Sequence, residues 1–180
     1  MLVGMDAPPV RELLKDSRVK VNEPDRFGRT PLWLAARWGY LDTIKEWIAS
    51  GREMDLGTPG DIDKTDAIGV AKKEGNAGVA TLLERFKENP NEIRHTVRVE
   101  LGLFDELAAE MFALVIFVSD GLLQTNDTTS SPVARFFNIS RSLPLELQMI
   151  VCYRVAGSAK EIIHGKHSEA AFKDLAKRMR

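Results

Sequence analysis

The feature that most constrains the fold is a pattern that recurs at a nearly fixed interval within the first 90 residues. Met54-Asp55 lies 33 residues after Val21-Asn22. A 36-residue spacing relates three positions in each of two units: Ala35, Gly39 and Trp47 recur as Ala71, Gly75 and Leu83. The three extra residues fall between positions 56 and 65, where Thr58-Pro59-Gly60 predicts a longer turn. Such spacing is typical of stacked repeats, in which each unit buries its apolar face only against its neighbours.

Two short helices are expected in the clearest unit. Residues 30–38 and 41–49 both place apolar side chains at helical spacing. Pro31 suits the first turn of a helix, and Gly39 suits the stop between the two segments. Trp33 falls among these apolar positions, and we expect it to be buried and structural.

The stretch Asp25-Arg26-Phe27-Gly28-Arg29-Thr30-Pro31-Leu32-Trp33-Leu34-Ala35-Ala36-Arg37-Trp38-Gly39 resembles the ankyrin repeat. The family pattern runs D-x-x-G-x-T-P-L-H-x-A-A-x-x-G, and Trp33 replaces its usual histidine. This resemblance implies an array at 1–90, with a partial first unit, a full unit at 25–51 and a degenerate unit at 58–88. The last of these carries Asp66-Ala67-Ile68 where the family has Thr-Pro-Leu.

Residues 91–180 are predicted to form a helical capping region. Pro90, between two asparagines, places the boundary near residue 90. We expect a long apolar helix at 98–123 that covers the hydrophobic end of the array, followed by a polar loop and further helices at 132–140, 144–156 and 168–178. The predicted fold class is therefore all-α, a short ankyrin-repeat array packed on a C-terminal helical bundle.

Composition narrows the functional classes. The 25 basic and 26 acidic residues give a net charge of −1, so bulk attraction to nucleic acid or to anionic lipid is not expected. Residues 1–9 lack the features of a secretory signal, and the apolar run 111–119 is too short to span a bilayer. Cys152 stands alone among apolar neighbours, which indicates a buried thiol and a reducing compartment, the cytoplasm or nucleus.

Catalytic, metal and cofactor motifs give no basis for predicting an enzyme. His164 and His167 lie close in sequence, but with His95 and Cys152 they lack the spacing of a zinc site. Nucleophile-elbow, Walker and dinucleotide-binding glycine patterns are missing from the sequence. Glu106 and Glu110 are one helical turn apart, a spacing common on solvated helix faces. We therefore expect no metal, no cofactor and no catalysis, with a helical enzyme of unassigned site as an alternative.

A second resemblance is shorter. Leu143-Pro144-Leu145-Glu146-Leu147-Gln148 resembles the opening of an F-box, a helical motif that docks ubiquitin-ligase scaffolds. This resemblance implies an adaptor whose C-terminal helices recruit a ubiquitin-ligase scaffold. An ordinary core helix opened by proline would give the same pattern.

The ankyrin resemblance implies a partner-binding groove. In this family the turn before the inner helix and that helix's exposed face contact partners, and the corresponding positions here are Arg26, Phe27, Arg29, Arg37, Trp38, Lys64 and Lys73. Arginine and aromatic residues are favoured anchors of protein interfaces, and the cations suit an acidic or phosphorylated partner segment. The expected function is thus recognition of another protein, with Arg29 and Arg37 as rim charges that the fold does not need. Alternatively, Phe27 and Trp38 only pack against the partial first unit or the C-terminal helices.

Overall fold

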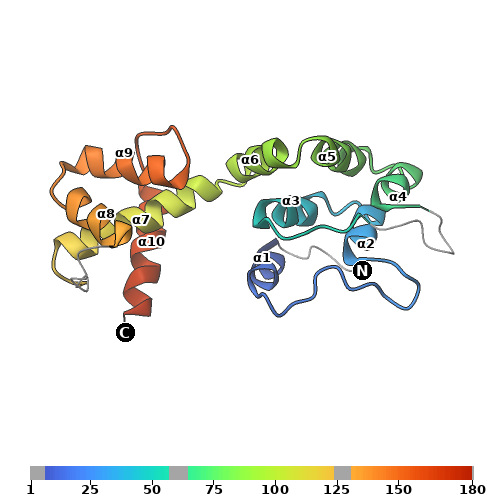
Figure 1. Ribbon diagram of the computed structural model, residues 1–180, viewed down its shortest axis with the longest axis horizontal. Coiled ribbons are helices and arrows are strands. Elements are labelled where there is room, and N and C mark those ends of the chain that lie inside the picture. The colour runs from blue at the N-terminus through green and yellow to red at the C-terminus, as the bar shows by residue number, and fades with distance from the viewer. Residues whose placement is uncertain (1–6, 57–64, 124–130, 180) are drawn as a thin grey trace. The chain divides into compact units, whose positions relative to one another are not determined.

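The computed structural model describes residues 7–56, 65–123 and 131–179. Ten α-helices and no β-strand lie in these ranges, which confirms the all-helical class for them (Figure 1). The chain divides after Leu101 into two compact units. The first unit carries the repeated pattern, and the second carries the C-terminal helices.

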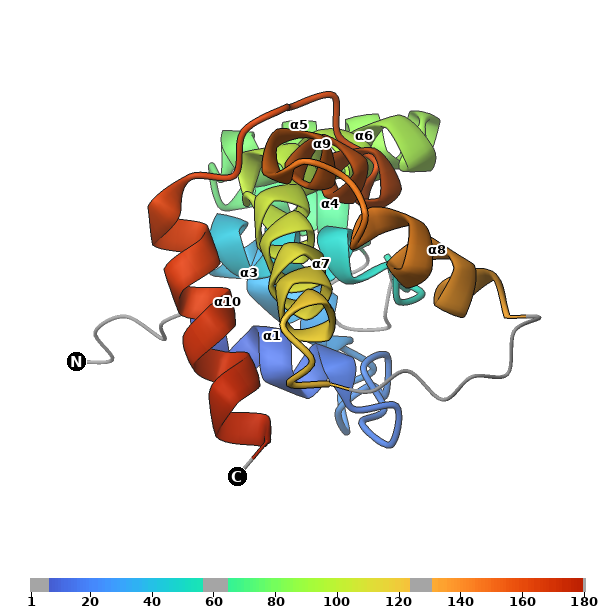
Figure 2. The same cartoon turned by 90° about the vertical axis from the view of Figure 1, so that its left-hand side faces the viewer.

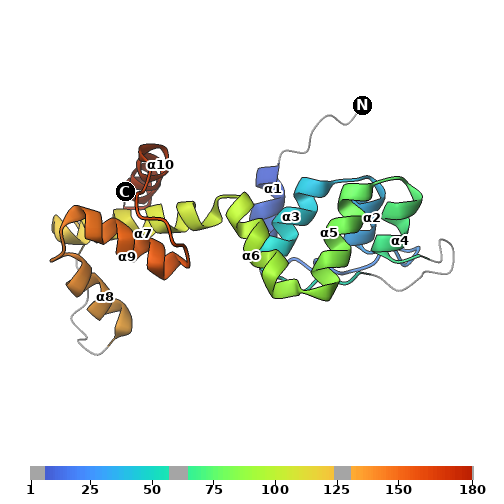
Figure 3. The ribbon, with the colours of Figure 1, turned by 90° about the horizontal axis from the view of Figure 1, so that it is seen from above.

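Helices of the first unit pack in a stack. Its described residues form α1 (Ala7–Lys15), α2 (Pro31–Arg37), α3 (Leu41–Ser50), α4 (Ala67–Lys73), α5 (Ala77–Glu88) and α6 (Pro90–Glu100). Helix α1 packs on α3, α2 packs on α4, and α6 packs on both α3 and α5 (Figures 1 and 3). The predicted helices at 30–38 and 41–49 are confirmed.

Local sequence explains where α2 begins and ends. The hydroxyl of Thr30 accepts a hydrogen bond from the Trp33 N–H at 3.2 Å, and Pro31 fills the first helical position. Gly39 follows the helix with φ +70°, which a side chain would strain. Helix α2 buries one face, which consists of Leu32, Trp33, Ala35 and Ala36.

Asparagine side chains join successive helix pairs. The Asn76 amide, just before α5, donates to the carbonyl oxygens of Ala36 (3.0 Å) and Arg37 (2.8 Å) at the end of α2. A Cβ on Gly39 would lie 2.7 Å from Asn76 Oδ1, so this close approach needs glycine. In the loop between α1 and α2, Asn22 donates to the Glu53 carbonyl at 3.1 Å and accepts from the Asp55 N–H at 3.2 Å.

Arginine side chains hold α1 and the loop after it against α3. Arg11 forms a two-pronged ion pair with Glu46 of α3, at 2.7 and 3.0 Å, although Glu46 is only 5% exposed. Arg52 follows α3 and donates to the carbonyl oxygens of Asp16 and Val19, each at 2.7 Å. A buried carboxylate needs such a partner, because an unpaired one would be costly.

The expectation of one helix over 98–123 is wrong. Leu101 and Gly102 separate α6 from α7 (Leu103–Ser119), and Gly102 has φ +70°. Helix α6 belongs to the first unit, where Arg98 Nε donates to the Ala49 carbonyl at 2.8 Å and Arg94 Nε to the Ile48 carbonyl at 3.3 Å. The helix that covers α3 and α5 is thus α6, and the boundary lies after Leu101 rather than near residue 90.

The second unit is organised around α7. Its other described helices are α8 (Pro132–Ser140), α9 (Leu145–Ala156) and α10 (Gly165–Arg178), and both α9 and α10 pack on α7 (Figure 2). The helices predicted at 132–140 and 144–156 are confirmed, while the last helix begins at Gly165 rather than residue 168. The core of this unit contains Ala108, Ala109, Phe112, Val115, Cys152, Tyr153, Ala156 and Ile163.

A polar network that runs from the buried Tyr153 to the exposed Lys160 joins α7, α9 and the loop that follows α9. Tyr153 donates its hydroxyl proton to Asp105 at 3.1 Å, and Lys160 Nζ lies 2.6 Å from the same carboxylate. Burial raises the pKa of Tyr153 to about 12, so the phenol stays neutral as a donor. Cys152 is buried as expected, and burial raises the pKa of its thiol to about 11.

Candidate partner-binding site

The turn that precedes α2 is held by the carboxylate of Asp25. Asp25 Oδ1 accepts the backbone N–H groups of Phe27 (2.9 Å) and Arg29 (3.0 Å), while Oδ2 accepts Arg29 Nη2 at 2.7 Å and Nε at 2.9 Å. Gly28 takes φ +77° and lets the chain reverse. The Arg29 guanidinium is the main reason that the pKa of Asp25 falls to about 2. These contacts fix the conformation of the turn.

Arginines alternate with aromatic rings from this turn along α2. The Arg26 and Arg29 guanidinium carbons each lie 4.7 Å from the centre of the Phe27 ring. Arg29 and Arg37 lie 6.0 and 5.5 Å from the Trp33 ring, and Arg37 lies 6.0 Å from the Trp38 ring. Each distance falls in the range of a cation–π contact. We call this set, consisting of Arg26, Phe27, Arg29, Trp33, Arg37 and Trp38, the arginine–aromatic surface.

The three rings differ in exposure. Trp33 is 3% exposed, and its Nε1 donates to the Thr65 carbonyl at 2.9 Å, which confirms that it is buried and structural. Phe27 is 41% exposed and Trp38 66%. Both rings therefore keep a large exposed area, and neither is buried within the first unit. An exposed large aromatic side chain is a feature of interface anchors.

The arginines are not equivalent, contrary to expectation. Arg29 is tied to Asp25 and lies between two rings, so it supports the turn instead of standing as an unattached rim charge. Arg37 is more exposed and forms an ion pair with Glu74, in which Arg37 Nε lies 3.7 Å from Glu74 Oε1. Arg26 is exposed and lies over the Phe27 ring.

The predicted lysines contribute less than expected. Lys73 is exposed in the last turn of α4, next to Glu74, while Lys64 lies outside the described residues. Lys72 is paired with Glu84 at 2.5 Å. Carboxylates thus accompany several cations of this region, and Glu74 is a functional candidate that sequence analysis missed. Its place in the repeat could have revealed it, because Glu74 lies 36 residues after Trp38.

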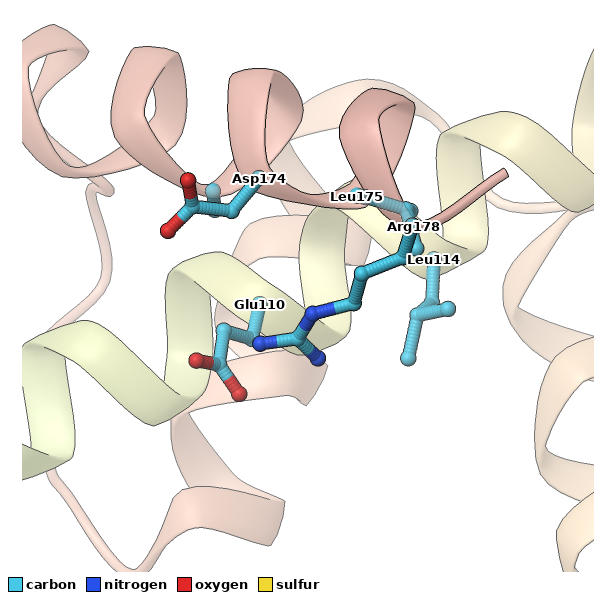
Figure 4. Close-up of a pocket in the computed structure, with 6 residues that line it drawn as sticks. Glu110, Leu114, Asp174, Leu175 and Arg178 are labelled. Carbon is cyan, nitrogen blue, oxygen red and sulfur yellow. The ribbon is translucent and has the colours of Figure 1, made fainter. Parts of the chain in front are cut away.

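Metal and catalytic candidates gain no support in the described residues. No group of three or more His, Cys, Asp or Glu side chains there is placed to bind a metal ion. A small pocket lies between α7 and α10 and is lined by Glu110, Leu114, Ala171, Asp174, Leu175 and Arg178 (Figure 4). The Arg178 side chain points toward Glu110, but Glu106 does not line the pocket. The two glutamates are therefore not brought together there.

The F-box-like segment forms the start of α9. Leu145 and Leu147 are 51% and 45% exposed, so both present apolar area at the surface. Gln148 is buried, and its amide donates to the Leu143 carbonyl at 3.0 Å, which fixes the entry to the helix.

Within the described residues, none of the helices is both long and apolar enough to cross a bilayer. Comparison of the chain with protein-family models, with curated proteins and with solved structures finds no match.

Proposed function

We propose that this chain is a non-enzymatic interaction module whose first unit binds an acidic or phosphorylated segment of another protein. The observation that carries the proposal is the arginine–aromatic surface. It presents Trp38 and Phe27, 66% and 41% exposed, beside arginines on a turn that Asp25 already fixes. A preformed site binds more tightly because little side-chain and loop entropy is lost on association.

The ankyrin-like architecture is part of the same proposal. Contacts between neighbouring units support it: Asn22, in the loop before α2, bonds Glu53 and Asp55 in the loop after α3, and Asn76, before α5, bonds the carbonyl oxygens at the end of α2. Helix α6 would then take the place of a terminal repeat. In such an array, turns and inner helices form a continuous surface along one side of the stack.

The chemistry of the surface indicates the class of partner. Exposed aromatic rings provide apolar area with little loss of conformational freedom on binding, and arginine donates paired hydrogen bonds to carboxylate or phosphate oxygens. Binding should weaken with added salt, because exposed charges are screened over about 10 Å at 0.1 M ionic strength.

A library of acidic peptides, each displayed with and without phosphorylation, tests the proposal. Peptides selected by the full chain are then measured by fluorescence anisotropy against Trp38→Ala and Arg37→Ala. A hot-spot residue should lower affinity by about 30-fold, or roughly 2 kcal/mol. Lys87→Ala is the matched control, since Lys87 is an exposed cation on α5. If Lys87→Ala weakens binding as much as Arg37→Ala, the arginine–aromatic surface is not the site.

The exposed leucines of α9 favour a second candidate, an adaptor that docks a ubiquitin-ligase scaffold through its C-terminal helices. Leu145→Glu and Leu147→Glu should abolish co-purification of ligase scaffold proteins, while Trp38→Ala should leave it unchanged. Co-purification that survives both leucine variants would remove this candidate.

A further inference from the structure

Glu74 occupies a conspicuous place beside the arginine–aromatic surface. It lies at the C-terminal end of α4 and reaches the guanidinium of Arg37 at the end of α2. We propose that Glu74 is an internal competitor, which holds Arg37 in the unbound chain and is displaced by a phosphate group on the partner segment. This inference rests on the proposed function and assigns the phosphate to Arg37.

The ion pair between Arg37 and Glu74 is weak. Its Arg37 Nε to Glu74 Oε1 distance is 3.7 Å, whereas Arg29 and Asp25 in the same surface approach to 2.7 Å. The Arg37 and Glu74 side chains are 36% and 40% exposed. Exposed pairs of this kind contribute little to stability, so a ligand displaces Glu74 at small cost.

The helix ends favour the cation of this pair. Arg37 lies in the last turn of α2, where the partial negative charge of the helix C-terminus stabilises its guanidinium. The same charge disfavours any anion nearby, so an incoming anion must gain more from Arg37 than the Glu74 carboxylate does. The neighbouring Lys72 is already paired with Glu84, at 2.5 Å.

Arg37 is held in place by contacts other than Glu74. Its guanidinium carbon lies 5.5 Å from the Trp33 ring and 6.0 Å from the Trp38 ring, and Asn76 holds its backbone carbonyl at 2.8 Å. None of these contacts involves Glu74, so the two rings remain beside the guanidinium when the carboxylate leaves. Trp38 lies beside it and would contact whatever side chain carries the incoming anion.

The ligand chemistry follows from what must be displaced. A ligand carboxylate exchanges one singly charged partner of Arg37 for another, so the net gain is small. A phosphate monoester carries a charge of about −1.5 to −2 at pH 7 and offers three strong acceptor oxygens. It also forms bidentate bonds with arginine, and the exposed Lys73 adds a second cation next to Glu74 in the chain. The site thus fits a phosphorylated side chain better than an aspartate or glutamate.

Two small probes test this inference in the full chain: phenyl phosphate and benzoate, which share a ring and differ in the anion. Binding is followed by the NMR signal of the Trp38 indole, assigned from Trp38→Phe. Wild type should bind phenyl phosphate more tightly than benzoate. Glu74→Gln should raise the affinity for phenyl phosphate by about three- to fivefold, the range expected when a surface ion pair is lost as a competitor. Glu84→Gln is the matched control, because it removes the same charge from a pair that does not involve Arg37.

Each contrary outcome has a distinct meaning. Equal affinities in Glu74→Gln, Glu84→Gln and wild type would overturn the competitor role, while the proposed function would still stand if Arg37→Ala abolished binding. Benzoate binding as tightly as phenyl phosphate would overturn the phosphate assignment. If neither probe shifts the indole signal in wild type or Glu74→Gln, Arg37 is no anion site, and the selected library peptides decide separately whether the first unit binds partners.

Discussion

Trp33 serves the core and the surface at once. Its indole is 3% exposed and bonds to the Thr65 carbonyl, yet Arg29 and Arg37 lie over the ring at 6.0 and 5.5 Å. A buried ring thereby contacts two partly exposed guanidinium groups. The histidine that the ankyrin pattern would place here offers less area for either task.

Replacing Trp33 tests its structural role. Trp33→Ala should lower the free energy of unfolding by about 3 kcal/mol or more, because it leaves a cavity and an unpaired carbonyl. Trp33→Phe keeps most of the apolar volume and should cost clearly less. Urea denaturation followed by circular dichroism measures both. A loss below about 1 kcal/mol for Trp33→Ala would show that the ring is not part of the core.

The pair of Asp25 and Arg29 should give the stability a pH dependence. The Arg29 guanidinium lowers the pKa of Asp25 to about 2, below the value of about 3.9 for an unfolded chain. Between these values the unfolded chain binds more protons, so this contribution is complete above pH about 4 and is lost as the pH falls through about 2.

Arg29→Gln removes the cause of that shift. NMR titration of the Asp25 carboxyl group should then give a pKa close to the ordinary value, and the loss of stability between pH 4 and 2 should become shallower. Arg26→Gln serves as the control, since Arg26 contacts the Phe27 ring but no hydrogen bond joins it to Asp25 among the described contacts. An Asp25 pKa that stays near 2 in Arg29→Gln would assign the shift to the backbone N–H groups instead.

Part of the candidate site could be predicted from sequence, and the limits have physical causes. Burial of Trp33 follows from helical periodicity, whereas the sequence left open whether Trp38 packs inside the chain or is exposed. The partners of Arg29 and Arg37 do not follow, because periodicity assigns a residue to a face but not to a contact. Lys73 was expected to add charge, while the adjacent Glu74, which offsets Arg37, carries no signal in a search for cations.

At the scale of the helix, the end of α2 depends on a neighbouring element. Gly39 allows Asn76 to approach and bond the carbonyl oxygens of Ala36 and Arg37. Gly39→Ala should cost about 1 to 3 kcal/mol, since it strains a left-handed residue and pushes Asn76 away. Asn76→Ala should cost about 1 to 2 kcal/mol by leaving acceptors unpaired.

The losses of stability caused by Gly39→Ala and Asn76→Ala should not be additive. Once Asn76 is gone, the Cβ introduced at position 39 no longer meets the Oδ1 atom that it would approach to 2.7 Å. The double variant should therefore lose less stability than the sum of the single variants, by a margin that urea denaturation can resolve. Additive losses would mean that the close approach is not what makes glycine necessary.

Helix starts were predictable where a proline occupies or directly precedes the first turn. Helices α2 and α8 begin at Pro31 and Pro132, and α9 begins one residue after Pro144. The break at Gly102 was missed because it lies among apolar residues, and a single glycine inside a helix costs only about 1 kcal/mol. Gly102, with φ +70°, follows α6, and the packing of α6 on α3 and α5 is a long-range contact that a pattern along one chain segment does not report.

For the whole molecule, the position of α6 changes which fragment should fold. Residues 1–90 lack this helix and expose the faces of α3 and α5 that it covers. Residues 1–101 should melt cooperatively, whereas residues 1–90 should show no cooperative transition, as expected of a repeat stack without its terminal cap. Circular dichroism melting of the two fragments decides this. Similar cooperative melting of both would show that α6 is dispensable for folding.

Arginine side chains hold segments of the first unit together through hydrogen bonds to main-chain oxygens. Arg52, Arg94 and Arg98 each donate to backbone carbonyl oxygens of another segment: Asp16 and Val19, Ile48, and Ala49. A guanidinium stays protonated at every physiological pH, and a carbonyl does not titrate, so acid cannot dissolve these junctions as it dissolves carboxylate pairs. Their vulnerability is covalent instead: deimination of Arg52, Arg94 and Arg98 to citrulline, which removes the charge, would weaken the contacts that the loop after α1 and α6 make with the end of α3, while leaving the carboxylate pairs intact.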